Sequence, residues 1–103
     1  MHIYHVMLPE AWNARQSDEA ITADSLTTEG FIHCSSAEQL EGVLERYFGG
    51  VSRVVILEID PEKLSSKLVF EPSTNNEEYP HVYGPIDPEA IISAEERQLR
   101  PVG

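Results

Sequence analysis

The chain is built from short runs in which apolar and polar side chains alternate, a pattern typical of β-strands. In the first run, residues 2–7, Ile3 and His5 share one side of the predicted strand. Further strands are predicted over residues 31–34, 51–59, 67–71 and 81–83. Residues 54–57 are apolar on both faces, which indicates a central strand. Residues 90–99 are compatible with either a final strand or a helix.

The clearest helical pattern lies in residues 37–48. Its apolar side chains form one stripe and its glutamates lie off that stripe, as in a helix with one buried face. A Gly-Gly pair at residues 49–50 ends the pattern. Ser35 and Ser36 each match the first position of a capping box. We expect Ser35 to be the N-cap of this helix.

Two shorter helices are predicted, one that begins at Pro9 and one over residues 25–29. Residues 16–24 and 72–80 have the composition of loops. Several short strands with two or three helices, and no regular strand–helix–strand alternation, predict an α+β fold rather than a doubly wound α/β fold. The length of 103 residues fits one domain over residues 1–103.

The charge of the chain bears on its partners. It carries 7 Lys and Arg against 18 Asp and Glu, a formal net charge of −11. A nucleic acid is therefore not expected as a partner, because affinity for nucleic acids comes largely from Lys and Arg. No apolar run reaches the length of a membrane span, and the first residues lack the pattern of a signal peptide. We expect a cytoplasmic protein with no membrane partner.

Polar and titratable side chains stand opposite apolar ones in several predicted strands. Because residues two apart share one face of a strand, one sheet face would collect these groups in a cleft. The candidates are His5, His33, Ser35, Glu71, His81 and Tyr83. The alternative is that each histidine occupies an ordinary solvated or hydrogen-bonded position. Histidine and glutamate are also zinc ligands, but no pair has the spacing of a zinc motif, so no residue is assigned to a metal.

Two neighbouring features bear on the chemistry of this cleft. His33 and Ser35 directly precede the helix at residues 37–48, whose N-terminus offers free backbone N–H groups. This favours binding of the phosphate or carboxylate group of a small-molecule ligand. Cys34 alternates with these residues and is expected to be a small buried apolar side chain rather than a nucleophile.

Three stretches resemble the signature of the DUF952 family. They are Ile3-Tyr4-His5, Ser25-Leu26 with Glu29-Gly30-Phe31-Ile32-His33-Cys34-Ser35, and Pro80-His81-Val82-Tyr83-Gly84-Pro85. Trp12, Gln39, Phe48 and Glu71 also match the pattern. The family often has phenylalanine before the third stretch, where this chain has Tyr79.

The resemblance implies a fold similar to that of the ADP-ribosyltransferases, with a small split antiparallel or mixed sheet around a cleft that holds NAD. It implies that His5 contacts the ribose, that His33 and Ser35 contact the nucleotide, and that Glu71 assists glycosidic cleavage. The other residues assigned to ligand binding are Ser25, His81 and Tyr83.

The family has no established activity, so the resemblance leaves several functions open. The first is binding of an NAD-like or ADP-ribose-like nucleotide, or of a small anion, in a histidine-rich cleft. Transferase or glycohydrolase chemistry with Glu71 and His33 as catalytic residues would extend it. The second is a non-catalytic binding or regulatory module, and the third is a zinc-binding protein. No cofactor is established by the residues, and NAD is the one that the resemblance suggests.

Overall fold

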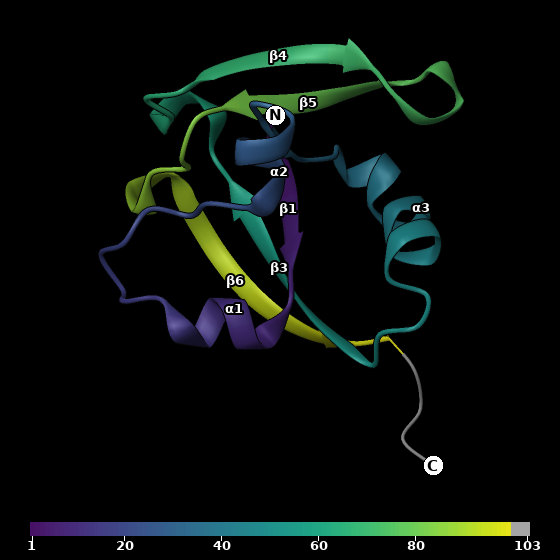
Figure 1. Cartoon of the computed structure of the whole chain (residues 1–103), viewed down its shortest axis with the longest axis horizontal. Helices are drawn as coiled ribbons and strands as arrows, with labels where there is room; N and C mark the ends of the chain where they lie inside the picture. The colour runs from purple at the N-terminus through teal and green to yellow at the C-terminus, as the bar shows by residue number, and fades with distance from the viewer. Residues whose placement is uncertain (100–103) are drawn as a thin grey trace.

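Two antiparallel sheets of three strands each carry the fold in the computed structural model, which describes residues 1–99 apart from the side chain of Thr74. The first sheet has the strand order β1-β3-β6 and the second the order β2-β5-β4 (Figure 1). The strands are β1 (Ile3–Met7), β2 (Ile32–His33), β3 (Arg53–Ile59), β4 (Lys67–Pro72), β5 (Glu78–Tyr83) and β6 (Ile91–Gln98). The predicted α+β class is confirmed.

Three α-helices accompany the sheets. They are α1 (Pro9–Ala14), α2 (Asp24–Thr28) and α3 (Ala37–Tyr47). Three single turns of 3-10 helix lie at Pro61–Lys63, Thr74–Asn76 and Pro88–Ala90. Among residues 1–99, no helix has both the length and the apolar character that a membrane span requires.

Strand β3 is the central element, as the sequence predicts, because both of its faces are buried. On one face Leu57 and Ile59 pack against Ile32 and Val82 of the second sheet. The opposite face packs against the apolar stripe of α3. The first sheet therefore lies between α3 and the second sheet, and the free energy of apolar burial holds these three layers together.

Within residues 1–99, one backbone bridge joins the two sheets. Tyr4 of β1 and Ser35, just after β2, exchange two backbone hydrogen bonds, each 2.8 Å from nitrogen to oxygen. Beyond this bridge the two segments diverge, because β1 continues along β3 while the chain turns into α3. The divergence opens a split at the edge of the first sheet.

The expectation that Ser35 caps α3 is wrong. The Ser36 hydroxyl accepts a hydrogen bond from Gln39 N at 3.3 Å, and Gln39 Oε1 accepts one from Ser36 N at 3.0 Å. This reciprocal pair is a capping box. Both serines fit the motif, but Ser35 is held in extended backbone by its bridge to Tyr4, so the N-cap is Ser36 and the helix begins at Ala37, the first residue of the predicted helix.

Two segments that the sequence leaves as a loop or as ambiguous are β-strand in the structure. Residues 78–80, which the sequence assigns to a loop, are the first part of β5, since Glu78 to Pro80 pair with β4. The turn between the strands is short because Asn75 and Asn76 adopt left-handed backbone, with φ of 58° and 65°, a conformation that asparagine tolerates better than most residues. Residues 91–98 are a strand rather than a helix, and they pair with β3.

The layered packing predicts the cost of removing one side chain of the α3 stripe. Leu44→Ala should lower the free energy of unfolding by about 2–5 kcal/mol, because Leu44 is buried against β3. The matched control Leu8→Ala removes a leucine that is 41% exposed and should change stability by about 0.5 kcal/mol or less. Urea unfolding measures both values, and similar losses in the two variants would contradict this packing.

Candidate functional site

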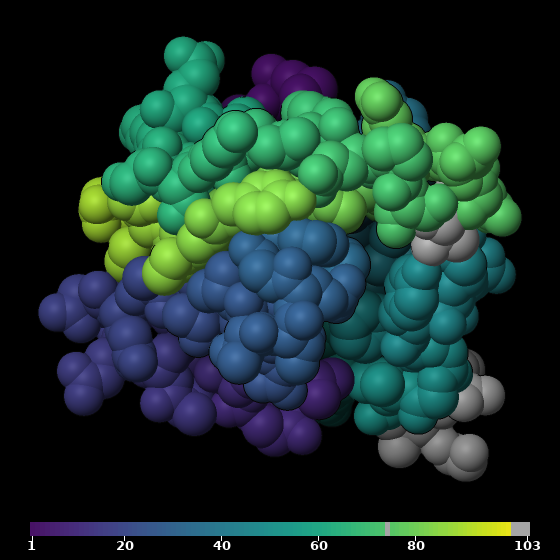
Figure 2. Space-filling model, turned by 45° about the horizontal axis from the view of Figure 1, so that its top comes forward, coloured from purple at the N-terminus to yellow at the C-terminus, as the bar shows by residue number. Residues whose placement is uncertain are grey.

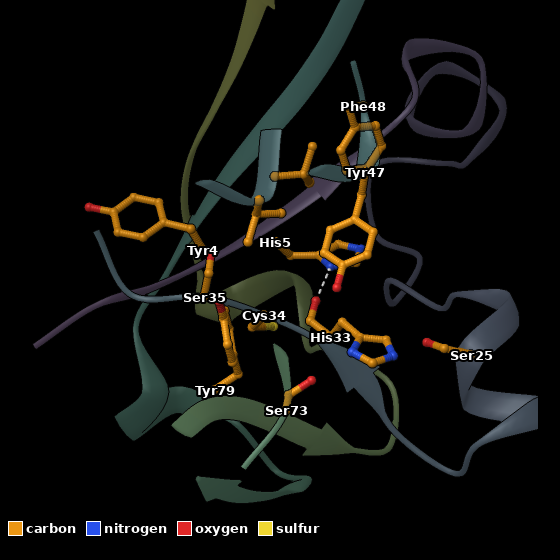
Figure 3. A pocket seen from close by; sticks show the side chains of 12 residues that line it. Tyr4, His5, Ser25, His33, Cys34, Ser35, Tyr47, Phe48, Ser73 and Tyr79 are labelled. Atoms are coloured by element: carbon orange, nitrogen blue, oxygen red, sulfur yellow. Dashed lines mark hydrogen bonds between the residues drawn. The ribbon is translucent and has the colours of Figure 1, made fainter. Parts of the chain in front are cut away.

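A cavity of about 300 Å³ lies in the split between the two sheets. Its wall is formed by β1, α2, the segment after β2, the C-terminal end of α3 and the β4–β5 hairpin (Figure 3). In the space-filling view, the blue segment that contains α2 lies beside the teal surface of α3 (Figure 2). Four of the predicted site residues line the cavity, namely His5, Ser25, His33 and Ser35.

His5 is the buried histidine of this cavity. Its Nδ1 donates a hydrogen bond to the His33 carbonyl oxygen at 2.8 Å, which leaves Nε2 as an acceptor in the neutral ring. Burial lowers the pKa of His5 from its ordinary value of 6.5, and the His33 carbonyl opposes this effect in part. His5 is therefore a neutral hydrogen-bonding group, suited to a hydroxyl of a ligand rather than to an anion.

The other polar groups of the wall differ in how accessible they are. His33 is exposed, and its Nε2 donates to Glu29 Oε2 at 3.0 Å. Ser25, on α2, is half-buried and faces the His33 side of the cavity (Figure 3). Ser35 is 2% exposed, and its backbone is held by the bridge to Tyr4. Ser25 and His33 are thus the polar side chains that a ligand can reach most easily.

Aromatic rings form a further part of the wall, and none of them is among the site residues predicted from the sequence. Tyr47 and Phe48 belong to the predicted apolar stripe of α3, but Tyr47 is 60% exposed and both rings line the cavity. Tyr79 also lines it, and its hydroxyl oxygen accepts a hydrogen bond from Arg46 at 2.7 Å. No sequence signal separates a stripe residue that is buried from one at the helix end that borders a cavity.

A second cluster lies on the second sheet. Glu71 Oε1 accepts hydrogen bonds from Tyr83 Oη at 2.6 Å and from His81 Nδ1 at 2.7 Å. These two bonds, that of Tyr83 first, lower the pKa of Glu71, and the same carboxylate raises the pKa of Tyr83. Glu71 is therefore a carboxylate at neutral pH, and about a third of its side chain is exposed.

Phe31 packs against this second cluster, although it is not among the site residues predicted from the sequence. Its ring stacks on His81 with centroids 4.0 Å apart, and it lies 4.9 Å from His33 and 5.3 Å from Tyr83. His81 is 3% exposed, and its Nε2 has no hydrogen-bond partner. The ring of Phe31 thus covers a histidine whose second nitrogen is buried and unpaired.

The structure divides the predicted cleft into two parts. His5, Ser25, His33 and Ser35 line the cavity, whereas Glu71, His81 and Tyr83 do not. The parts adjoin through His33, whose ring centroid is 5.3 Å from that of His81. They also adjoin through Tyr79, which lines the cavity and stands opposite Glu71 in the β4–β5 ladder. The periodicity of the sequence predicts which side chains share one face of each strand. It does not predict which of them line the cavity and which belong to the second cluster.

Two other expectations concern Cys34 and metal ions. Cys34 is 5% exposed, and burial raises the pKa of its thiol to about 12, so it is not a thiolate nucleophile at neutral pH. Within residues 1–99, no three His, Cys, Asp or Glu side chains are grouped so that they could hold a metal ion.

These features define an α+β protein with two antiparallel sheets and a cavity at the split between them. A model of the family described as "Protein of unknown function (DUF952)" matches residues 6–94. The chain belongs to this family. No functionally curated protein matches it.

Solved structures of protein CC0527 from Caulobacter crescentus have a similar fold. The crystal structure superposes with a TM-score of 0.83 at 25% sequence identity and covers 93% of this chain and 85% of that chain. The solution NMR structure gives a TM-score of 0.78 at 24% identity and covers 96% of this chain and 86% of that one. The likeness extends over nearly the whole chain and supports the arrangement of sheets described above.

The buried His5 predicts a pH dependence of stability. Because its folded pKa lies below the unfolded value of 6.5, the folded state binds fewer protons. Stability is therefore full above the unfolded pKa and is lost as the pH falls from there toward the folded pKa. The slope should reach at most about 1.4 kcal/mol per pH unit.

Urea unfolding between about pH 7.5 and pH 5, the range in which histidines titrate, measures this slope. His5→Gln should flatten it, and the control His2→Gln, at an exposed histidine, should keep the wild-type slope. An unchanged slope in His5→Gln would show that His5 does not cause the acid sensitivity.

Proposed function

We propose that the cavity binds one nucleoside, a base with its ribose, of a nucleotide such as NAD or ADP-ribose. The observation that carries this proposal is the composition of the cavity wall, which combines aromatic rings with imidazole and hydroxyl groups. A planar base stacks on aromatic rings, and ribose hydroxyls pair with neutral donors and acceptors. The rings of Tyr47 and Phe48 would stack on the base. The side chains of His5, Ser25 and His33 would form hydrogen bonds with the ribose hydroxyls.

The size and charge of the cavity define which part of the nucleotide fits. A volume of about 300 Å³ is at the lower end of small-molecule sites and suits one nucleoside rather than a whole dinucleotide. No Lys or Arg is among the described residues that line it, so the phosphates would lie outside. Two of the backbone groups at the start of α3, Ser36 N and Gln39 N, are already used by the capping box. A small anion alone is therefore the weaker candidate.

Catalysis is the extension of this proposal, and Glu71 supports it. Glu71 is a partly exposed carboxylate that is bonded to His81 and stands opposite the cavity residue Tyr79, so it would stabilise positive charge that develops on a ribose at the Tyr79 edge of the cavity as a leaving group departs. The reaction class would be transfer or hydrolysis at the glycosidic carbon. A non-catalytic binding or regulatory module is the alternative that uses the same cavity without this step.

The binding proposal predicts that NAD or ADP-ribose at millimolar concentration shifts the imidazole NMR signals of His5 and His33. His33→Ala should weaken binding about tenfold, the scale of one lost hydrogen bond to a ligand. The matched control is His2→Ala, since His2 is also exposed and also pairs with one glutamate, Glu58, at 2.6 Å. Absence of any shift with both nucleotides would remove the proposal, and so would an equal loss of affinity in the two variants.

The catalytic extension predicts that the wild-type protein slowly releases nicotinamide from NAD and that Glu71→Gln lowers this rate by about 10²–10³-fold, as for loss of a charge-stabilising group. Affinity for NAD should change by less than about threefold, because Glu71 does not line the cavity. Chromatographic detection of nicotinamide measures the rate. Binding without any nicotinamide release from the wild-type protein would favour the non-catalytic module.

A further inference from the structure

The outer face of the second sheet carries a group of four rings, of which only that of His33 belongs to a residue that also lines the cavity. Ile32 and Val82 point into the core between the sheets, so the residues that alternate with them point away from it. His33 and His81 are directly opposite each other on this outer face. Phe31 contacts both of them and Tyr83. Tyr83 is 38% exposed, so the rings reach the surface of the molecule.

Carboxylates flank this group on two sides. Glu71 lies on β4, on one side of β5, and is held by His81 and Tyr83. Glu29 precedes β2, on the other side of β5, and is held by His33. The side chain of Glu71 is 35% exposed and that of Glu29 is 48% exposed. Both anions are therefore open to solvent next to aromatic rings.

The carboxylate of Glu71 can accept more hydrogen bonds than it receives from the described residues. Both of its bonds go to the same oxygen, Oε1. Among the described residues, no side chain donates a hydrogen bond to its second oxygen. A carboxylate oxygen accepts two hydrogen bonds, so this group can receive a donor from outside the chain.

We propose that this surface, formed by Phe31, Tyr83, Glu29 and Glu71, binds the guanidinium group of an arginine side chain presented by a peptide or protein partner. A cation is attracted to the faces of aromatic rings and to carboxylates. A planar guanidinium can do both at once, because it stacks on a ring and directs a fork of N–H donors at a carboxylate. The net charge of −11 draws a cationic partner toward the protein.

The unpaired nitrogen of His81 is a second, independent observation that points to a donor. Because Nδ1 donates to Glu71 Oε1, Nε2 of the neutral ring is an acceptor, and it is buried without a partner. Such a group is rare in native proteins and costs free energy until it is paired. An N–H donor that reached Nε2 in the plane of the ring would supply the missing bond.

One cation of the protein itself lies near this surface. Lys67 is on the same strand as Glu71 and stands opposite Tyr83 in the ladder. Its charge contributes to the lowered pKa of Glu71, but least of the causes that act there. Among the described residues it forms no ion pair with either carboxylate, so both carboxylates remain available to a ligand.

The test uses N-acetyl-arginine amide and, as its neutral isostere, N-acetyl-citrulline amide. At millimolar concentration the arginine compound should shift the aromatic NMR signals of His81 and Tyr83, and the citrulline compound should not. The corresponding lysine amide should bind more weakly, because an ammonium neither stacks nor forms a fork. Equal shifts with citrulline, no shifts with arginine, or lysine binding as tight as arginine would each overturn the proposal.

Variants locate the binding to this surface. Glu71→Gln should weaken arginine binding about tenfold, the value of one charge-assisted hydrogen bond. Phe31→Leu keeps an apolar side chain without the ring face and should weaken it about threefold. The matched control Glu58→Gln changes a glutamate that also pairs with a histidine, His2, and should leave binding unchanged. An equal loss in Glu58→Gln would overturn the proposal.

This inference does not depend on the nucleotide proposal. The nucleotide titration reads signals of the cavity residue His5, whereas the arginine titration reads Tyr83 of the outer face. If the nucleotide causes no shift of the His5 signals, the arginine titration still tests the arginine proposal. If arginine causes no shift of the Tyr83 signals, the nucleotide titration still tests the nucleotide proposal.

Discussion

The backbone bridge between Tyr4 and Ser35 is the constraint on which the rest of the site depends. It links the first sheet to the second at one residue pair, with two hydrogen bonds of 2.8 Å. Because the link is so short, the segments part immediately beyond it, and side chains of β1, α2 and α3 close the resulting space without filling it. A longer ladder between β1 and β2 would merge the sheets and leave no cavity.

The same geometry explains why the site has two chemical characters. Residues on the inner side of the split meet a space with neutral polar groups and aromatic rings, as around His5 and Tyr47. Residues on the outer face of the second sheet, such as Glu71, meet solvent and carry charge. His33 belongs to both, because its backbone carbonyl holds His5 and its ring contacts His81. A ligand that displaces His33 in one part would therefore also change the hydrogen bond to His5 or the contact with His81 in the other part.

The sequence predicted those parts of the fold that depend on local pattern. The period of β1, the double-sided burial of β3 and the stripe of α3 follow from neighbours along the chain, and the structure confirms them. The two adjacent serines before α3 fit the same motif, and only the tertiary bridge to Tyr4 decides between them. Residues 91–98 were ambiguous because an edge strand with solvated side chains lacks the apolar alternation that identifies a strand. The partners of His81 depend on register between strands, which local pattern does not determine.

The central position of β3 has a consequence for the time during which the chain is synthesised. β1 precedes β3, so one edge of β3 can be paired as soon as β3 has left the ribosome. The other edge is covered only by residues 91–98, which are made about 30 residues later. Until then the exposed edge of a strongly apolar strand is a template for pairing with other chains. Once β6 has paired with β3, β6 is the outer strand of the sheet, and its charged residues Glu95, Glu96 and Arg97 disfavour further pairing with other chains.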